Sequence, residues 1–158
     1  MKILLLLVMT TVLNKPLIIK SPAFSNNEWI PVKYTCVGSN INPALAITDI
    51  PNDTKSLAII VDDPDAPNGT FVHWVMWNVP VISMIDENSA PGIQGKNGKG
   101  ENKYFGPCPP TGTHHYNFKV YALDAKLILP LGANKNVLLK AMDGHILASG
   151  SLIGLFKK

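Results

Sequence analysis

The sequence contains no arginine, and all 14 of its basic residues are lysine. Arginine carries the planar, forked donor group that suits phosphate and guanine, so its absence argues against sequence-specific binding of nucleic acid. The lysines are also scattered, apart from Lys96, Lys99 and Lys103, whereas a nucleic-acid-binding surface concentrates its positive charge. The net charge is only +3, and we therefore expect no nucleic-acid partner.

Cysteine is scarce as well, with only Cys36 and Cys108 and no Cys-x-x-Cys arrangement. This pattern argues against a zinc site or thioredoxin-type chemistry. In an exported protein the two residues could form a disulfide, and closing so long a loop would stabilise the fold by about 4 kcal/mol in the chain-entropy model. In the cytoplasm they would act as small buried hydrophobic residues.

The apolar run at the N-terminus, Ile3 to Leu13, has 11 residues. It is shorter than the ~20 residues that a membrane-spanning helix needs, but it suits a signal peptide. A small-x-small cleavage pattern is missing around residues 13–15. We predict a signal peptide at 1–14 and export to the periplasm or medium. The alternatives are an apolar N-terminal extension or first strand, and a cytoplasmic protein.

The composition predicts one folded domain, which we place at residues 15–158. Hydrophobic residues make up 46% of the chain and charged residues 16%, which is enough apolar material for a core. The 13 prolines and 12 glycines predict many turns and favour a strand-rich fold over a helical bundle.

Hydrophobic patterns predict four strands, at 56–61, 71–79, 115–123 and 146–156. The first is apolar throughout and is expected to be buried on both faces. One helix is predicted after Asn134, which can cap its start, and it ends before Gly144. The stretch 80–104 is polar and long, which is typical of a functional or mobile loop. Its glycine-rich part at 95–100 lacks the Lys-Ser/Thr that follows a phosphate-binding loop.

Polar residues with the chemistry of a binding site gather at the ends of these predicted strands. Asp63 and Asp65 follow the first strand, His73 lies near the start of the next, and a proline-rich turn at 106–113 leads to His114 and Tyr116. Protonated imidazoles, the tyrosine hydroxyl and backbone N–H groups near Cys108 can all donate hydrogen bonds to an anion. We expect anion affinity to rise as the pH falls through the histidine range.

Other chemistries for these residues are weaker. A hydrolase could use Asp63 with His73, or Cys108 as nucleophile with His114 as base. However, Cys108 stands between prolines, with no helix start to lower its pKa. A metal site formed by Asp63, His73 and His114 is chemically reasonable, but no close-spaced histidine pair of the His-Glu-x-x-His kind is present. We therefore expect no enzyme, no metal and no cofactor.

The same segments resemble the phosphatidylethanolamine-binding protein family, and especially its prokaryotic, Raf-kinase-inhibitor-like branch. The resemblance rests on Asp-Pro-Asp-Ala-Pro at 63–67, His-Trp at 73–74, and Gly-Pro-Cys-Pro-Pro-x-Gly-x-His-His-Tyr at 106–116. It extends in order over roughly residues 16–156. The resemblance implies a mainly β fold of antiparallel sheets in Greek-key arrangement, with a few peripheral helices.

The resemblance also implies a small pocket that accepts phosphate-type anions, including phospholipid head groups. Its lining would comprise Asp63, Asp65, His73, Cys108 (through backbone), Pro109, Pro110, His114 and Tyr116. We predict a regulatory binding module whose partner is a small anion such as phosphate or phosphoethanolamine. The alternative is a protein-interaction module that inhibits a kinase or protease, with the 81–103 segment contacting the partner. A homodimer is compatible with the resemblance, but no feature of the sequence tests it.

Overall fold

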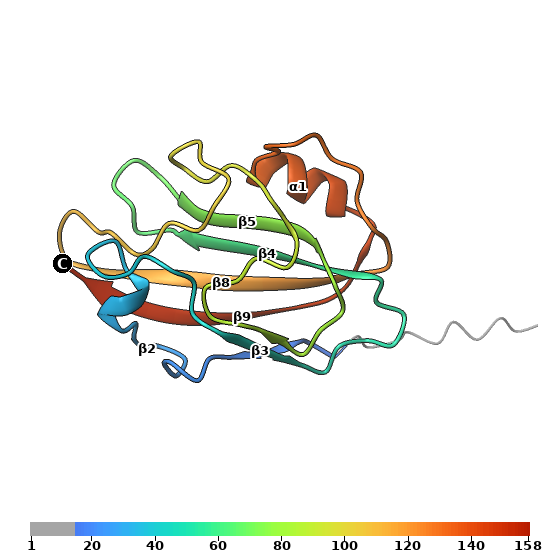
Figure 1. Ribbon diagram of the computed structural model, residues 1–158, viewed down its shortest axis with the longest axis horizontal. Coiled ribbons are helices and arrows are strands. Elements are labelled where there is room, and N and C mark those ends of the chain that lie inside the picture. Colours follow the sequence, from blue (N-terminus) through green and yellow to red (C-terminus); the bar gives the residue numbers. More distant parts are fainter. Residues whose placement is uncertain (1–14) are drawn as a thin grey trace, which may run out of the picture.

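The computed structural model describes residues 15–158, and the predicted signal peptide at 1–14 lies outside the described residues. Two sheets dominate this part of the chain. The smaller sheet has the order β1-β3-β6, and the larger has the order β2-β9-β8-β4-β5-β7. Figure 1 shows β5, β4, β8 and β9 side by side, with α1 near β5. The prediction of a mainly β fold is confirmed.

The elements have the following bounds. The smaller sheet is formed by β1 (Ile18–Lys20), β3 (Leu45–Thr48) and β6 (Met84–Ile85). The larger sheet is formed by β2 (Glu28–Trp29), β4 (Ser56–Asp63), β5 (Phe71–Val79), β7 (Ile93–Gln94), β8 (Thr113–Leu123) and β9 (Ile146–Lys157). The helical elements are a 3₁₀ turn (Val32–Tyr34) and α1 (Lys135–Met142).

The strand β4 is central to the larger sheet because it pairs antiparallel with both β5 and β8. All eight of its residues are buried, as its continuous apolar pattern predicted. After β7 the chain returns so that β8 lies beside β4, a long return of the kind that Greek-key folds use. Of the strand pairs in this sheet, only β2 with β9 is parallel.

The larger sheet carries a hydrophobic core on each face. On one face Leu57 and Ile59 pack with side chains of the smaller sheet, such as Ile47. On the other face Ala58 and Ile60 lie in a second cluster with residues of α1. Because successive side chains of a strand point to opposite faces, one apolar strand can serve both cores.

The predicted helix is confirmed at the position expected for it. The Asn134 side chain accepts a hydrogen bond from the Val137 N–H at 3.1 Å, which satisfies one of the free donors of the first turn. The helix ends just before Gly144, whose φ of +76° suits glycine. Within residues 15–158, no helix has the length and apolar character needed to cross a bilayer.

The stretch 80–104 differs from the prediction of one long loop. It contributes β6 to the smaller sheet and β7 to the larger one. The Trp74 indole N–H donates to the Gln94 side chain at 2.8 Å, and Asn97 bonds to the backbone of residues 99, 101 and 103. Strands of two residues have no periodicity to detect, so the sequence showed only polar composition here.

Candidate functional site

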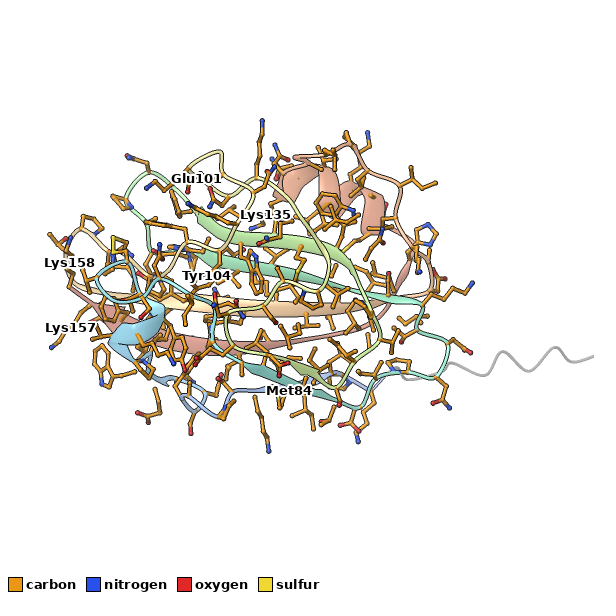
Figure 2. All side chains as sticks on the ribbon, in the orientation of Figure 1. Met84, Glu101, Tyr104, Lys135, Lys157 and Lys158 are labelled. Carbon is orange, nitrogen blue, oxygen red and sulfur yellow. A yellow bond between two sulfur atoms is a disulfide. The ribbon has the colours of Figure 1, made fainter. Side chains whose placement is uncertain are left out.

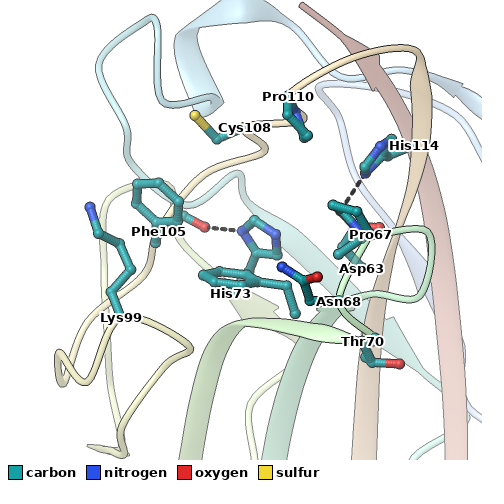
Figure 3. A pocket seen from close by; sticks show the side chains of 13 residues that line it. Asp63, Pro67, Asn68, Thr70, His73, Lys99, Phe105, Cys108, Pro110 and His114 are labelled. Atoms are coloured by element: carbon teal, nitrogen blue, oxygen red, sulfur yellow. Dashed lines mark hydrogen bonds and ion pairs between the residues drawn. The ribbon is translucent and has the colours of Figure 1, made fainter.

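A cavity of about 450 Å³ opens where β4 ends and β5 and β8 begin (Figure 3). Antiparallel pairing brings these strand termini together at one end of the sheet, so side chains far apart in the sequence meet there. The lining residues come from β4, from the connection to β5, from β5 itself and from the segment before β8. They are Asp63, Ala66, Pro67, Asn68, Gly69, Thr70, Phe71, His73, Lys99, Phe105, Cys108, Pro110 and His114.

Asp63 and His114 form a buried pair across the β4–β8 interface. The Nδ1 of His114 lies 2.7 Å from Oδ2 of Asp63, and the two side chains are only 8% and 5% exposed. A carboxylate accepts hydrogen bonds, so the imidazole donates from Nδ1. This leaves Nε2 as the free ring nitrogen of His114. The bond to Asp63 also fixes the orientation of the His114 ring, which lines the cavity.

His73 is oriented in an equivalent way by a backbone group. Its Nδ1 lies 2.7 Å from the carbonyl oxygen of Phe105, and this carbonyl can only accept (Figure 3). The Phe105 ring stacks parallel to the imidazole at 5.8 Å, and the Phe71 ring meets it edge-on at 4.9 Å. Burial lowers the pKa of His73, an effect opposed by the Phe105 carbonyl and by the negative charge of Asp63. His73 is therefore a mainly neutral group at neutral pH, again with Nε2 free.

Tyr116 lies beneath the two histidines rather than on the cavity wall. Its ring is fully buried, 5.2 Å from the ring of His73 and 6.5 Å from that of His114. Burial first, and then the charge of Asp63, raise the pKa of Tyr116 well above its usual range, although the Cys108 backbone amide partly offsets this. The hydroxyl finds no well-formed hydrogen bond among residues 15–158. Tyr116 therefore packs against both imidazoles from the core side and supports their positions.

The proline-rich turn at 106–113 forms one wall of the cavity, and Cys36, which does not line the cavity, anchors it. Cys108 forms a disulfide with Cys36, and the Cys36 N–H donates to the Pro107 carbonyl at 3.1 Å. Gly106 lies so close to the backbone that a Cβ there would approach the carbonyl oxygen of Tyr34 to 2.4 Å. Of the predicted prolines, Pro110 lines the cavity, whereas Pro109 is buried and does not.

Asp65 does not line the cavity, although the sequence placed it there. Its Oδ2 accepts hydrogen bonds from both the backbone N–H and the Nδ1 of His115, at 2.8 and 2.7 Å. These bonds lower the pKa of Asp65. Both side chains are exposed, at 40% and 52%, because β8 alternates and directs His115 away from the cavity that His114 lines. Asp65 thus ties the β4–β5 connection to β8.

Three cavity features were not predicted. Lys99 places its Nζ 4.5 Å from the centre of the Phe105 ring, and it is the only lysine in the lining. The aromatic pair Phe71 and Phe105 and the connection 66–70 complete the rim. The glycine- and lysine-rich stretch at 95–100 was a signal for Lys99, but its spacing fitted no phosphate-loop pattern. No pattern in the sequence predicted that the Phe71 and Phe105 rings lie side by side.

Nitrogen groups outnumber unpaired carboxylates in the cavity lining. Asp63 is paired, and neighbouring Asp62 is directed to the α1 side, where Lys119 and Lys135 reach its Oδ2 at 2.9 and 2.5 Å. Two imidazoles and one ammonium group therefore face the space with little uncompensated negative charge. Among residues 15–158, no group of three histidine, cysteine or carboxylate side chains is arranged to hold a metal ion.

Comparison with known proteins gives consistent results. The sequence profile described as phosphatidylethanolamine-binding protein matches residues 20–157. UPF0098 protein PH1269 of Pyrococcus horikoshii is 50% identical over 149 residues, covering 87% of this chain and 75% of the relative. A UPF0098 protein of Methanothermobacter thermautotrophicus is 45% identical over 148 residues, covering 89% of this chain and 98% of the relative.

Two crystal structures share the fold. The phosphatidylethanolamine-binding protein homologue CT736 of Chlamydia trachomatis superposes with a TM-score of 0.87 at 42% identity, covering 90% of this chain and 98% of the homologue. Escherichia coli YbcL, described as a member of the mammalian family, superposes with a TM-score of 0.84 at 26% identity, covering 91% and 99%.

Proposed function

The chain belongs to the phosphatidylethanolamine-binding protein family, and we propose that it is a regulatory binding module whose cavity takes a phosphate-type anion. Free phosphate and the phosphate of a phospholipid head group present the same chemistry to the cavity. Both offer oxygen acceptors and negative charge, which the lining nitrogen donors complement.

One observation carries the proposal: each cavity histidine has its Nδ1 committed to a protein acceptor. His114 donates to Asp63 and His73 donates to Phe105, both at 2.7 Å. Each ring is therefore fixed in orientation and keeps Nε2 for a ligand. When the ring is protonated, Nε2 becomes a charged donor, which forms shorter and stronger bonds to phosphate oxygens than a neutral donor does. Lys99 adds a positive charge at the rim.

The pairing of Asp63 resolves an objection to an anion site. A free carboxylate in the cavity would repel phosphate, but the bond to His114 directs its charge into a buried pair. A protonated His114 would make this pair neutral overall and leave its outer nitrogen for the ligand. The carboxylate thus binds the inner nitrogen of His114 and does not contact the anion.

The test is calorimetric titration with phosphate and with phosphoethanolamine at about pH 6, where histidine titrates. We expect saturable binding to the wild-type protein and none to a His73→Ala/His114→Ala variant. His115→Ala is the matched control, because it removes the adjacent histidine, which is directed away from the cavity. Equal binding by the double variant and the control would refute the anion site. Tighter binding of phosphoethanolamine than of phosphate would favour the head group as the source.

We propose binding without catalysis. The one hydrolase that the sequence left open with a protein nucleophile required the Cys108 thiol, and in the structure this sulfur is bonded to Cys36. We also propose that the protein functions outside the cytoplasm, since disulfides persist in oxidising compartments. Mass spectrometry of the protein from its native host, with and without alkylation, tests this: two free thiols would contradict it.

Inhibition of a kinase or protease is a second candidate. It is favoured by the segment 81–103, which the sheets hold in a defined shape and which exposes the apolar side chains Val81, Met84 and Ile93. A Val81→Ser/Met84→Ser variant should keep phosphate binding and lose capture of such a partner. Retention of both by the variant would contradict a role for this segment.

A further inference from the structure

The segment from Ala125 to Met142 contains three lysines and no carboxylate over 18 residues. It comprises the connection after β8 and the whole of α1. Neither the cavity nor the sequence motifs involve it. Within it lie the two most exposed large hydrophobic side chains of residues 15–158: Ile128 is 101% exposed and Leu131 is 89% exposed. Values this high mean that neither side chain packs against other side chains of residues 15–158.

The backbone of this connection is anchored, so the exposure is not that of a loose loop. The Asn78 side chain makes two hydrogen bonds to the backbone of Leu127, each 2.8 Å long. Its amide nitrogen donates to the Leu127 carbonyl, and its amide oxygen accepts from the Leu127 N–H. Leu127 is buried in the core between α1 and the larger sheet. At the other end Ala133 is buried in the same core, and its carbonyl accepts from the Lys96 N–H at 3.1 Å.

Between these anchors the chain forms a short projecting tip, residues 128–131. Its N–H and C=O groups are partly satisfied by a turn in which the Ala133 N–H donates to the Pro130 carbonyl at 3.1 Å. Pro130 restricts the backbone, and Gly132 adopts a φ of +76° that lets the chain turn back. Leu129 is directed towards the core and packs against it. The fold thus holds Ile128 and Leu131 in water, where apolar side chains are unfavourable.

Exposed lysines lie close to the tip and on α1. Lys126 is exposed two residues before Ile128, and the Lys96 side chain passes Gly132, with its Cε 3.2 Å from where a Cβ would be. Lys140 is exposed on α1, beside the exposed Val137 and Leu139. The carboxylates that flank the segment in sequence are Asp124, which bonds to His145 at 2.7 Å, and Asp143. In space, Glu101 stands next to Asn102, whose side chain approaches Gly132, and it pairs with Lys103 at 3.6 Å. The surface therefore combines projecting apolar groups with several exposed lysines.

From this arrangement we propose that the 128–131 tip docks on an anionic phospholipid bilayer, with Ile128 and Leu131 entering the interface and Lys96, Lys126 and Lys140 contacting lipid phosphates. Aliphatic side chains between lysines match a bilayer surface, whose head groups are anionic and whose interior is apolar. A stable protein interface instead needs about 800 Å² of complementary surface per partner, which two projecting side chains do not provide. The proposal is independent of the anion cavity.

Co-sedimentation with vesicles tests the proposal. The full protein should bind vesicles of phosphatidylglycerol and phosphatidylcholine, and it should bind pure phosphatidylcholine weakly. Ile128→Ser/Leu131→Ser should weaken partitioning by about tenfold or more, since the apolar contribution is lost. Neutralising Lys96 and Lys126 to glutamine should weaken it by about fivefold for each lysine. Raising NaCl from about 0.1 M to about 0.5 M should also release the protein, because salt screens exposed charges.

Matched controls are available elsewhere on the surface. Met84→Ser removes an exposed apolar group on the other side of the molecule, where Figure 2 shows Met84 far from α1. Lys20→Gln/Lys158→Gln removes the same charge away from the tip; Figure 2 places Lys158 at the far end of the molecule. Both controls should bind vesicles like the wild type, and all variants should match its circular dichroism and unfolding midpoint.

Three outcomes would overturn the proposal. Equal partitioning of the tip variant and the wild type would exclude the tip. Loss of binding by His73→Ala/His114→Ala with retention by the tip variant would assign membrane binding to head-group capture in the cavity. A wild-type dimer in analytical ultracentrifugation that the tip variant dissociates, with no vesicle binding, would assign the tip to a second copy of the chain.

Discussion

The carboxylate of Asp63 and the imidazole of His114 form a buried pair, with 2.7 Å between Oδ2 and Nδ1. Close by, Asp65, two residues after Asp63, and His115, the residue after His114, form a pair of the same length that is exposed. The two pairs have identical chemistry and opposite environments, which provides a comparison inside one protein.

The buried pair should matter more for stability than the exposed one. Removing Asp63 with an Asp63→Ala substitution leaves a buried imidazole donor without its acceptor, and we expect the free energy of unfolding to fall by about 3 kcal/mol. Asp65→Ala should cost less than about 1 kcal/mol, because solvent screens that pair. Urea unfolding at neutral pH measures both values. Equal losses of unfolding free energy in the two variants would mean that burial does not set the contribution of the Asp63–His114 pair to stability.

His73 should make the protein less stable as the pH falls. Burial lowers the pKa of its folded state below the ordinary value of about 6.5, so the unfolded chain binds more protons in this range. The stability that neutral His73 contributes is fully present above the ordinary histidine pKa. It is lost as the pH falls from that value towards the lower pKa of the folded state. His73→Asn keeps a donor for the Phe105 carbonyl and removes the titration. Urea unfolding from about pH 8 to about pH 5 should therefore show a shallower decline in the variant.

The same shift predicts where anion binding strengthens. Protonated His73 donates from Nε2, so sulfate affinity should rise as the pH falls, and most of the rise due to His73 should come below the ordinary histidine range. Sulfate is the preferred probe because its own charge is constant between about pH 5 and pH 8, unlike that of phosphate. Calorimetry on the wild type and His73→Asn measures this. Affinity independent of pH in the wild type would contradict the role of charged histidine.

The disulfide should support both stability and the cavity. Cys36 and Cys108 are 72 residues apart, and a loop of this size corresponds to about 4 kcal/mol in the chain-entropy model. Cys36→Ser/Cys108→Ser should lose stability of that order and bind phosphate more weakly, since Cys108 lines the cavity. A reductant should have the same effects on the wild type and none on the variant. Unchanged phosphate affinity in the variant would show that the turn keeps its shape without the bond.

Lys99 should contribute to affinity without contributing to the fold. Its ammonium group lies over the Phe105 ring, 4.5 Å from the ring centre, and Lys99 lines the cavity. Lys99→Gln should weaken phosphate binding by about fivefold, as expected for one charge-assisted contact of about 1 kcal/mol. Lys103→Gln is the control, because Lys103 is close in sequence but does not line the cavity. Calorimetry at low salt distinguishes them, and equal losses would indicate only a general effect of charge.

Much of the architecture could be predicted from local patterns. The apolar run of β4, the alternation of β8 and the cap at Asn134 each correspond to an element found in the structure. Their physical basis is local: side-chain period and backbone donors are properties of short segments. The stretch 80–104 was misjudged because β6 and β7 depend on partner strands far along the chain.

The sequence by itself determined which groups are available for chemistry: the absence of arginine, the histidines at strand ends and the proline-rich turn. Only the tertiary structure decided how these groups are used. Strand pairing set the register that turns His114 inwards and His115 outwards, and with them Asp63 and Asp65. The disulfide and the approach of Phe105 to His73 likewise depend on contacts between distant segments. Such contacts are fixed by packing of the whole core, and no short stretch of sequence contains them.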